Sequence, residues 1–185
     1  MRESTPQLLQ EDLKAELEKL FKEQTFLTPP LRDGEEPEEP KRARLNVFKQ
    51  WVPVSITGTR QDEITPEMIE QGKVDTYTAD RVFPYIIVRI SEGKIKNPSA
   101  EQAVNIVLIF GVYDPDENNT GYLDILHMIE TIRHRFFSNP ILSGKFECIS
   151  DMDWAMQDEE SYPYNFGSLS MNFLTAAIRR EDRYA

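Results

Sequence analysis

The segment from Phe83 to Phe137 carries the main apolar runs of the chain and constrains its fold more than any other. Two runs, FPYIIVRI (Phe83–Ile90) and VNIVLIFGVY (Val104–Tyr113), are β-branched and aromatic and too short for membrane helices, so both are predicted strands. In the second run one face is uniformly apolar: Val104, Ile106, Leu108, Phe110 and Val112. The other face carries Val107, Ile109 and Tyr113. A strand apolar on both faces must be covered on both, which predicts the centre of a sheet or a sheet partly covered by another subunit.

The next segment, Tyr122–Phe137, changes to a helical period. Its apolar stripe consists of Tyr122, Ile125, Leu126, Ile129, Ile132 and Phe136. Asn119 or Thr120 is the predicted N-cap, because a side-chain oxygen there accepts from free backbone N–H groups. Proline cannot continue a helix, so Asn139-Pro140 predicts its end. We expect the apolar stripe to pack on one face of the sheet.

A second amphipathic helix is predicted at residues 6–23, with Thr5 as N-cap and Pro6 at the first helical position. Its stripe is Leu9, Leu13, Leu17, Leu20 and Phe21. Residues 24–44 then form a charged linker, in which an acidic proline-rich run (33–40) precedes four residues, KRAR (41–44). Two interpretations remain open for this linker: a solvated loop, or an arm that docks on a partner or on phosphates.

The rest of the chain alternates strands with polar segments. Residues 45–54 predict an edge strand because of Pro53, and the polar excursion 55–82 contains a short helix between Thr65 and Gly72. Further strands are predicted at 145–150, 152–156 and 166–174, with a turn at 157–165 and a polar tail at 179–185. The fold class is therefore α+β: one domain over residues 1–185, with an antiparallel or mixed sheet of about four to five strands and two main helices packed on it, the sheet and central helix spanning 45–178.

Composition excludes several classes of function. The net charge of −11, from 32 acidic and 21 basic residues, argues against a duplex-DNA binder and against binding to an anionic membrane surface. One cysteine allows neither an intrachain disulfide nor a zinc site built on cysteines. The polar N-terminus predicts no signal peptide, and no run is long enough to span a membrane. We expect a protein of a cytosol-like compartment.

Catalytic motifs are absent from the sequence. It has neither a glycine-rich phosphate loop nor a nucleophile elbow, and Cys148, within a predicted strand, is expected to be a buried apolar residue. His127, Glu130 and His134 lie along one helix and could supply metal ligands, although no third histidine exists. The alternative interpretation of these three residues is a partly exposed helix face. We assign no catalytic, cofactor-binding or metal-binding residue.

Four segments in order resemble the tail-terminator (tail-completion) proteins of long-tailed bacteriophages and phage-tail-like particles. They are the "PY" strand at Pro84–Arg89, the "FG-Y-D" strand at Phe110–Asp114, the "GY-D" helix at Gly121–Arg133 and the "YPY" motif at Tyr162–Gly167. The resemblance covers about residues 8 to 178, and it rests on the joint order of the motifs. The acidic linker at Asp33–Pro40 and the excursion at Ser55–Asp80 depart from the family pattern.

The resemblance implies a small ring-forming α/β subunit without catalysis or cofactor. Such subunits form a homo-hexameric ring that caps the tail tube, stops polymerisation of the tube protein and presents a surface to the head–tail connector protein. A sheath protein is a further partner if the tail is contractile. DNA passes through the lumen without specific binding, membranes are not involved, and the protein resides at the head-proximal end of the virion tail after assembly in the host cytoplasm.

Aromatic and basic residues in the loops and near the tail are the predicted partner interface. They are Trp51, Arg60, Tyr77, Arg81, Tyr162, Tyr164, Arg179 and Arg180. Tyr162 and Tyr164 also have a structural interpretation, as a clamp where the last strand begins. Three other functions remain open: a head-completion or connector ring protein, a metal-dependent enzyme built on His127, Glu130 and His134, and a cellular adaptor that binds its partner through the first helix.

Overall fold

The computed structural model describes residues 5–30, 41–53, 82–96 and 101–175. The helices within these ranges are α1 (Pro6–Leu20) and α4 (Tyr122–Ser138). The strands are β1 (Phe26–Leu27), β2 (Arg42–Ala43), β3 (Asn46–Lys49), β4 (Tyr85–Ile95), β5 (Gln102–Tyr113), β6 (Ile141–Leu142), β7 (Phe146–Met156) and β8 (Tyr164–Thr175). None of the described helices is long and apolar enough to cross a membrane.

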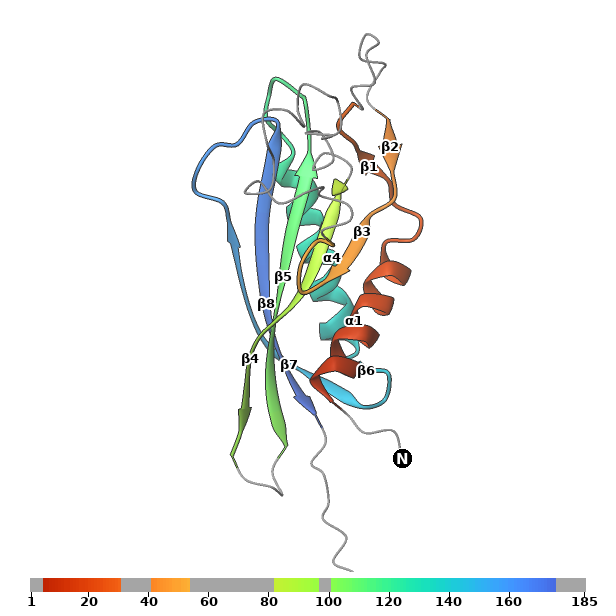
Figure 1. Cartoon of the computed structure of the whole chain (residues 1–185), viewed down its shortest axis with the longest axis vertical. Coiled ribbons are helices and arrows are strands. Elements are labelled where there is room, and N and C mark those ends of the chain that lie inside the picture. Colours follow the sequence, from red (N-terminus) through yellow and green to blue (C-terminus); the bar gives the residue numbers. More distant parts are fainter. Residues whose placement is uncertain (1–4, 31–40, 54–81, 97–100, 176–185) are drawn as a thin grey trace, which may run out of the picture.

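The main sheet has six strands in the order β3-β4-β5-β8-β7-β6 (Figure 1). Only the pair β3–β4 is parallel, and the other neighbours are antiparallel. A separate two-stranded sheet joins β1 to β2. The predicted α+β class is confirmed, with more strands in the main sheet than the four to five expected.

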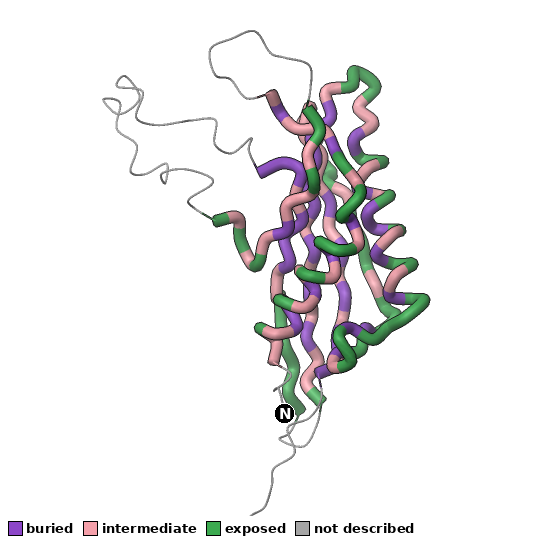
Figure 2. Tube along the Cα trace, turned by 90° about the vertical axis from the view of Figure 1, so that its right-hand side faces the viewer, coloured by how far each residue is buried: buried purple, intermediate pink, exposed green. Residues whose placement is uncertain are grey.

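Both helices cover one face of the main sheet, and the hydrophobic core lies between them and the strands. The predicted apolar face of β5 is fully buried in this core, together with Leu169, Met171 and Phe173 of β8. Because β5 and β8 occupy the middle of the sheet, the prediction of a central strand at Val104–Tyr113 is confirmed. Figure 2 shows buried residues alternating with exposed ones along the helices and concentrated within the strands.

The opposite face of the sheet, here called the open face, has no helix on it among the described residues. Val107 and Ile109 on this face are half-buried, whereas their neighbours Ile106 and Leu108 on the helix face have no exposed surface. Asn105 of β5 donates to the Ser170 hydroxyl at 2.9 Å and to the Asn172 side-chain oxygen at 3.0 Å, across to β8. This part of the open face is thus apolar at Val107 and Ile109 and polar at Asn105, Ser170 and Asn172.

Helix α1 follows its predicted pattern closely. The Thr5 side chain accepts from the backbone N–H of Leu8 at 3.2 Å, which confirms the N-cap, and the first three leucines of the stripe are fully buried. The helix ends at Leu20, three residues before the predicted end. Its polar side is held by ion pairs from Glu16 to Arg135 of α4 and from Glu11 to Lys49 of β3, the second at 3.2 Å.

A glutamine pair joins α1 to the sheet. The Gln10 side-chain amide, on the buried side of α1, donates to the backbone oxygen of Val88 at 2.7 Å and to the Gln50 side-chain oxygen at 3.2 Å. The Gln50 side chain in turn accepts from the Ile90 N–H at 3.1 Å and donates to the Ile90 carbonyl at 3.2 Å. The Gln50 side chain therefore bonds to the backbone of β4 just beyond the point where the pairing of β3 with β4 ends.

Helix α4 confirms the predicted boundaries but corrects the predicted cap. The N-cap position is Gly121, which has no side chain to cap the helix. The hydroxyl of Thr120, one of the predicted caps, instead donates to the Asp114 carboxylate at 3.0 Å. Asn119 has a positive φ of 51°, within the loop before the helix. The buried stripe is Ile125, Met128, Ile129, Ile132 and Phe136. Two residues predicted to be in this stripe are not buried: Tyr122 is exposed and Leu126 is half-buried.

Other predicted boundaries needed correction. The linker 24–44 is not wholly irregular, because β1 and β2 pair across it. The two strands predicted at 145–150 and 152–156 form one strand, β7, with a bulge between Ile149 and Met152. Strand β4 continues to Ile95, beyond the predicted Ile90, because β5 pairs with it through Gln102. The acidic run 33–40, the predicted helix at 65–72 and the tail 179–185 lie outside the described residues.

Candidate partner interface

Aromatic residues from three strands meet at one end of the open face and form what we call the aromatic cluster: Phe83, Tyr85, Tyr113, Tyr164 and Phe166. The Phe83 ring lies at its centre, with centroid distances of 5.1 Å to Tyr85, 4.8 Å to Tyr164 and 6.0 Å to Phe166. The rings of Tyr113 and Tyr164 are 5.6 Å apart. Tilted and edge-on pairs at these distances are favourable beyond their burial of apolar area.

Strand register explains why these residues meet. Tyr85 is opposite Gly111, Gly111 is opposite Phe166, and Tyr113 is opposite Tyr164, so β4, β5 and β8 each place aromatic side chains on the same face. Burial in the cluster raises the pKa of the Tyr85 phenol above its ordinary value. The structural interpretation of Tyr164 as a clamp where the last strand begins therefore fits its position.

The loop before α4 and the turn before β8 are tied together beside the cluster. Both Phe83-Pro84 and Tyr162-Pro163 are cis. The Asp114 N–H donates to the Pro163 carbonyl at 2.9 Å, and the Tyr162 hydroxyl donates to the Pro115 carbonyl at 2.9 Å. These two bonds fix the position of the Tyr162 ring, about half of which is exposed.

Acidic side chains lie close together in the same loop. Asp114 is 8% exposed and accepts hydrogen bonds from the Asp116 N–H and the Thr120 hydroxyl, both at 3.0 Å. Burial raises the pKa of the Asp124 carboxyl above its ordinary value, and the nearby Asp114 raises it further. Within the described ranges, no three acidic, histidine or cysteine residues form a group that could hold a metal ion.

Trp51 and Arg89 form a second feature of the open face. The Arg89 guanidinium lies 4.6 Å from the centre of the Trp51 ring, a distance at which a cation and an aromatic face attract each other. Trp51 is 63% exposed, and Arg89 is half-buried. An exposed tryptophan stacked on an arginine has the composition typical of an interface anchor.

Of the predicted interface residues, the structure describes Trp51, Tyr162 and Tyr164. Tyr164 lies within the aromatic cluster, whereas Tyr162 and Trp51 are exposed. The remaining five lie outside the described residues: Arg60, Tyr77, Arg81, Arg179 and Arg180. Sequence reasoning missed Arg89 and Trp154, the latter 55% exposed on β7. The sequence predicted a strand over 152–156, but it could not predict that Trp154 would lie where that strand forms the edge of the sheet.

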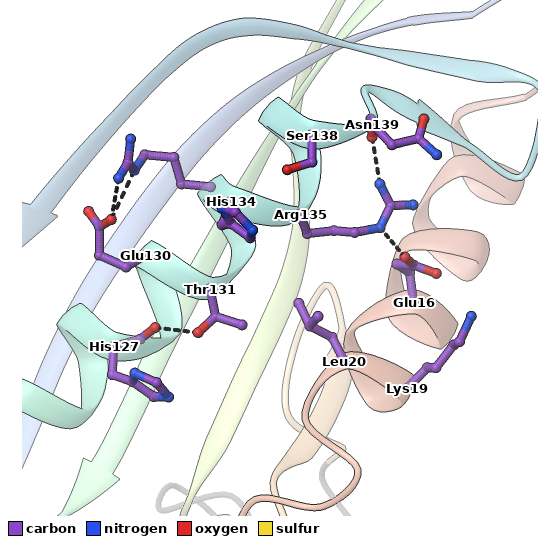
Figure 3. Close-up of a pocket in the computed structure, with 11 residues that line it drawn as sticks. Glu16, Lys19, Leu20, His127, Glu130, Thr131, His134, Arg135, Ser138 and Asn139 are labelled. Atoms are coloured by element: carbon purple, nitrogen blue, oxygen red, sulfur yellow. Dashed lines mark hydrogen bonds and ion pairs between the residues drawn. The ribbon is translucent and has the colours of Figure 1, made fainter.

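An open groove of about 870 Å³ lies between α1 and α4, and both histidines line it (Figure 3). Glu130 is engaged by Arg133 at 3.0 Å, and the side chains of His127, Glu130 and His134 point in different directions. The Thr131 hydroxyl donates to the His127 carbonyl at 2.8 Å, and Arg135 reaches across to Glu16. The three residues of the metal hypothesis therefore do not converge on one point.

Cys148 is buried on the helix face of β7, as predicted. Burial raises the pKa of its thiol to about 12, and Arg135 opposes that shift only in part. A thiolate is the reactive form of cysteine, so this side chain is suited to packing rather than to nucleophilic chemistry.

Comparison with known proteins yields no assignment: no protein-family model matches the chain, and no curated protein matches it. Among the described residues, the exposed aromatics on or beside the main sheet that could contact a partner include Trp51, Trp154 and Tyr162.

Proposed function

We propose that this protein is a tail-terminator subunit of a long-tailed bacteriophage or a phage-tail-like particle. In this account six copies form a ring that caps the finished tail tube, ends polymerisation of the tube protein and offers the surface to which the head is joined. The subunit acts by binding and needs neither a catalytic residue nor a cofactor.

The observation that carries the proposal is the ordered set of four sequence segments, together with the contacts between them. The "PY" segment begins β4, the "FG-Y-D" segment ends β5, the "GY-D" segment begins α4, and the "YPY" segment begins β8. Phe83, next to the first segment, is in ring contact with Tyr164 of the last. Because these segments are far apart in sequence and contact one another, together they support the proposed function better than any one segment alone.

Exposed aromatic residues support a role in assembly. Trp51, Trp154 and Tyr162 are each about half exposed or more, and tryptophan and tyrosine are enriched at the centres of protein interfaces. The half-buried apolar residues of the open face, Val107 and Ile109, also favour contact with a further protein surface. The proposed partners are other copies of the chain, the tail tube protein, the head–tail connector protein and, in a contractile tail, the sheath protein.

The charge of the chain supports the same role. A net charge of −11 per subunit produces a repulsive field for phosphates when copies are arranged around a channel. DNA would then pass through the lumen without specific binding. In this account the protein is assembled in the host cytoplasm and resides at the head-proximal end of the tail.

The proposal is tested by the location of the protein. Free tails and free heads are separated from a lysate, and the tails are imaged after labelling with an antibody to this chain. We expect label at one end of each tail, the end that joins the head. Label along the whole tube would identify a tube protein, and protein that remains with the heads would identify a connector.

A further inference from the structure

One long edge of the main sheet has no strand beside it in the described part of the chain. Strand β6 pairs only with the first two residues of β7, and the Cys148 N–H donates to the Pro140 carbonyl at 2.8 Å. From Ile149 to Met156 no described strand pairs with the outer side of β7. We call residues 149–156 the β7 edge. Its backbone groups are available to pair with another strand.

The opposite side of the same sheet has a second edge of this kind. Strand β3 pairs with β4 only over Tyr85–Val88, and Gln50 then bonds to both backbone groups of Ile90. Beyond that point, residues 91–96 are all exposed, and no described strand lies on their outer side. We call these residues the β4 tip. They belong to the β4–β5 hairpin that extends past the helices in Figure 1.

We propose that the two edges bind each other between copies of this chain, the β4 tip of one copy pairing antiparallel with the β7 edge of the next. The pairing would continue the sheet across the subunit boundary. This inference rests on the proposed function in one respect: the pairing would be the surface through which neighbouring subunits of the ring join.

The faces of the two edges match in one register. Placing Lys94 opposite Asp153 puts Ile95 opposite Met152 and Gly93 opposite Trp154. Lys94 pairs within its own chain with Ala103, and Asp153 with Ser170, so both lie on the open face. The apolar members all lie on the helix face, because Gly93 pairs with Val104 and Met152 with Met171. Charged residues would thus meet charged residues, and apolar residues would meet apolar ones.

The exposure of apolar residues on both edges supports the pairing on the helix face. Ile95 is 67% exposed and Trp154 is 55% exposed, the former on the tip and the latter on the edge. Burying both against a second copy removes apolar surface from water, which drives association. Gly93 has no side chain, so the broad Trp154 ring could lie across it as aromatic residues do across strand glycines.

The charges of the two edges support the pairing on the open face. The β7 edge contains Asp151 and Asp153 and no basic residue, and the following turn adds Asp158, Glu159 and Glu160. The β4 tip contains two bases, Lys94 and Lys96, and one acid, Glu92. In the same register Lys96 would lie opposite Asp151, and Glu92 would lie opposite the uncharged Ala155. Opposite charges on facing strands stabilise a pair, and like charges destabilise it.

The arrangement makes a prediction about symmetry. Because the two edges differ and lie on opposite sides of one sheet, the contact is head-to-tail rather than two-fold. Contacts of this kind produce a closed ring when the rotation closes. The β7 edge of one copy cannot satisfy the β7 edge of another, since both are acidic.

Mixed disulfide cross-linking tests the contact. Lys94→Cys and Asp153→Cys are made in separate full-length chains, mixed, and oxidised at concentrations up to the solubility limit. Facing Cα atoms in an antiparallel pair lie within the range of Cα separations that a disulfide spans. We expect a cross-linked dimer only in the mixture, and none with either variant alone or with the parent chain, whose Cys148 is buried.

Charge reversal provides a second readout that does not depend on cysteine. Lys94→Asp or Asp153→Lys alone should weaken self-association by about tenfold, and the double variant should recover most of the loss. A matched control is Glu101→Lys, which reverses an exposed charge at the residue just before β5 rather than on either edge.

Two outcomes overturn the inference: no mixed cross-link at a concentration where light scattering detects self-association, or a chain that stays monomeric up to its solubility limit. Either result leaves the proposed function to be judged separately, because tail localisation does not depend on which surface joins the subunits. If the cross-link forms but the label is absent from tails, the edge contact stands and the proposed function fails.

Discussion

The ring of Tyr85 lies against the backbone of Gly111 on the neighbouring strand, so closely that a Cβ at Gly111 would stand 2.4 Å from the ring carbon Cζ. The two residues face each other in the register of β4 and β5. One belongs to the "PY" segment and the other to the "FG-Y-D" segment. The absence of a side chain at Gly111 is therefore what allows the aromatic cluster to close over β5.

Gly111→Ala should lower the free energy of unfolding by about 1–3 kcal/mol, because the Tyr85 ring must move to accept the methyl group. Urea unfolding measures the change. Gly93→Ala is the matched control on the same strand pair, where the nearest atom is the flexible end of Gln102 at 3.3 Å. In a Tyr85→Ala background the cost at Gly111 should shrink; an unchanged cost would show that the ring is not its cause.

Ile129→Ala should lower the free energy of unfolding by about 2–5 kcal/mol, because a fully packed side chain leaves a cavity. Ile129 is 2% exposed and faces the sheet from the middle of α4. Ile129→Asp should prevent folding, since it buries an unpaired charge. Leu123→Ala and Leu123→Asp, at a half-exposed position of the same helix, serve as controls. A soluble Ile129→Asp variant with a cooperative melt would contradict the placement of α4.

Asp124→Asn should change how stability depends on pH. Burial and the neighbouring Asp114 raise the Asp124 pKa above its ordinary 3.8, so the folded chain holds this proton more tightly than the unfolded chain. The contribution of Asp124 to stability is therefore largest below pH 3.8 and is lost as the pH rises through the folded pKa. The stability of the variant relative to the parent should rise with pH across that window and then level off. A difference that is independent of pH, or that falls, would contradict the raised pKa.

Cys148 should react with a thiol reagent far more slowly in the folded protein than in urea. The rise in pKa from 9.0 to about 12 alone lowers the thiolate fraction about a thousandfold near pH 8. Absorbance after addition of an aromatic disulfide reagent measures the rate. Reaction of the folded protein at the rate of the unfolded chain would show that Cys148 is accessible.

The pattern of apolar residues made the core predictable. In β8 the alternating Leu169, Met171 and Phe173 are buried, and in β5 the uniformly apolar face is fully buried, whereas Val107 and Ile109 on its other face are half-buried. The end of α4 followed from Asn139-Pro140. The N-cap of α4 could not be predicted in the same way. The Thr120 hydroxyl bonds to Asp114 rather than to the helix, and nothing in the local sequence indicates this partner.

Short strands and edge positions were beyond sequence reasoning. β1, β2 and β6 are two residues long, too short for any period, and they form because neighbouring segments supply partners. In the candidate site, Tyr162 and Tyr164 were predicted together, but Tyr164 is partly buried in the aromatic cluster by the strand register, and Tyr162 is exposed in the turn before the strand. Contact between Phe83 and Tyr164 depends on the order of strands in the sheet, which has no local signal.

The central claim, that this chain ends the growth of a tail tube, is tested most directly by the lengths of tails assembled without it. A subunit that occupies the growing end of the tube leaves polymerisation unchecked when it is missing. Tails in lysates of a deletion strain are therefore measured by electron microscopy, with the parent strain and a complemented deletion as controls. The account predicts a broad distribution that extends to excessive lengths, with tails that do not join filled heads. A sharp distribution at the parental length would contradict it, and heads that leak DNA beside such tails would identify a connector.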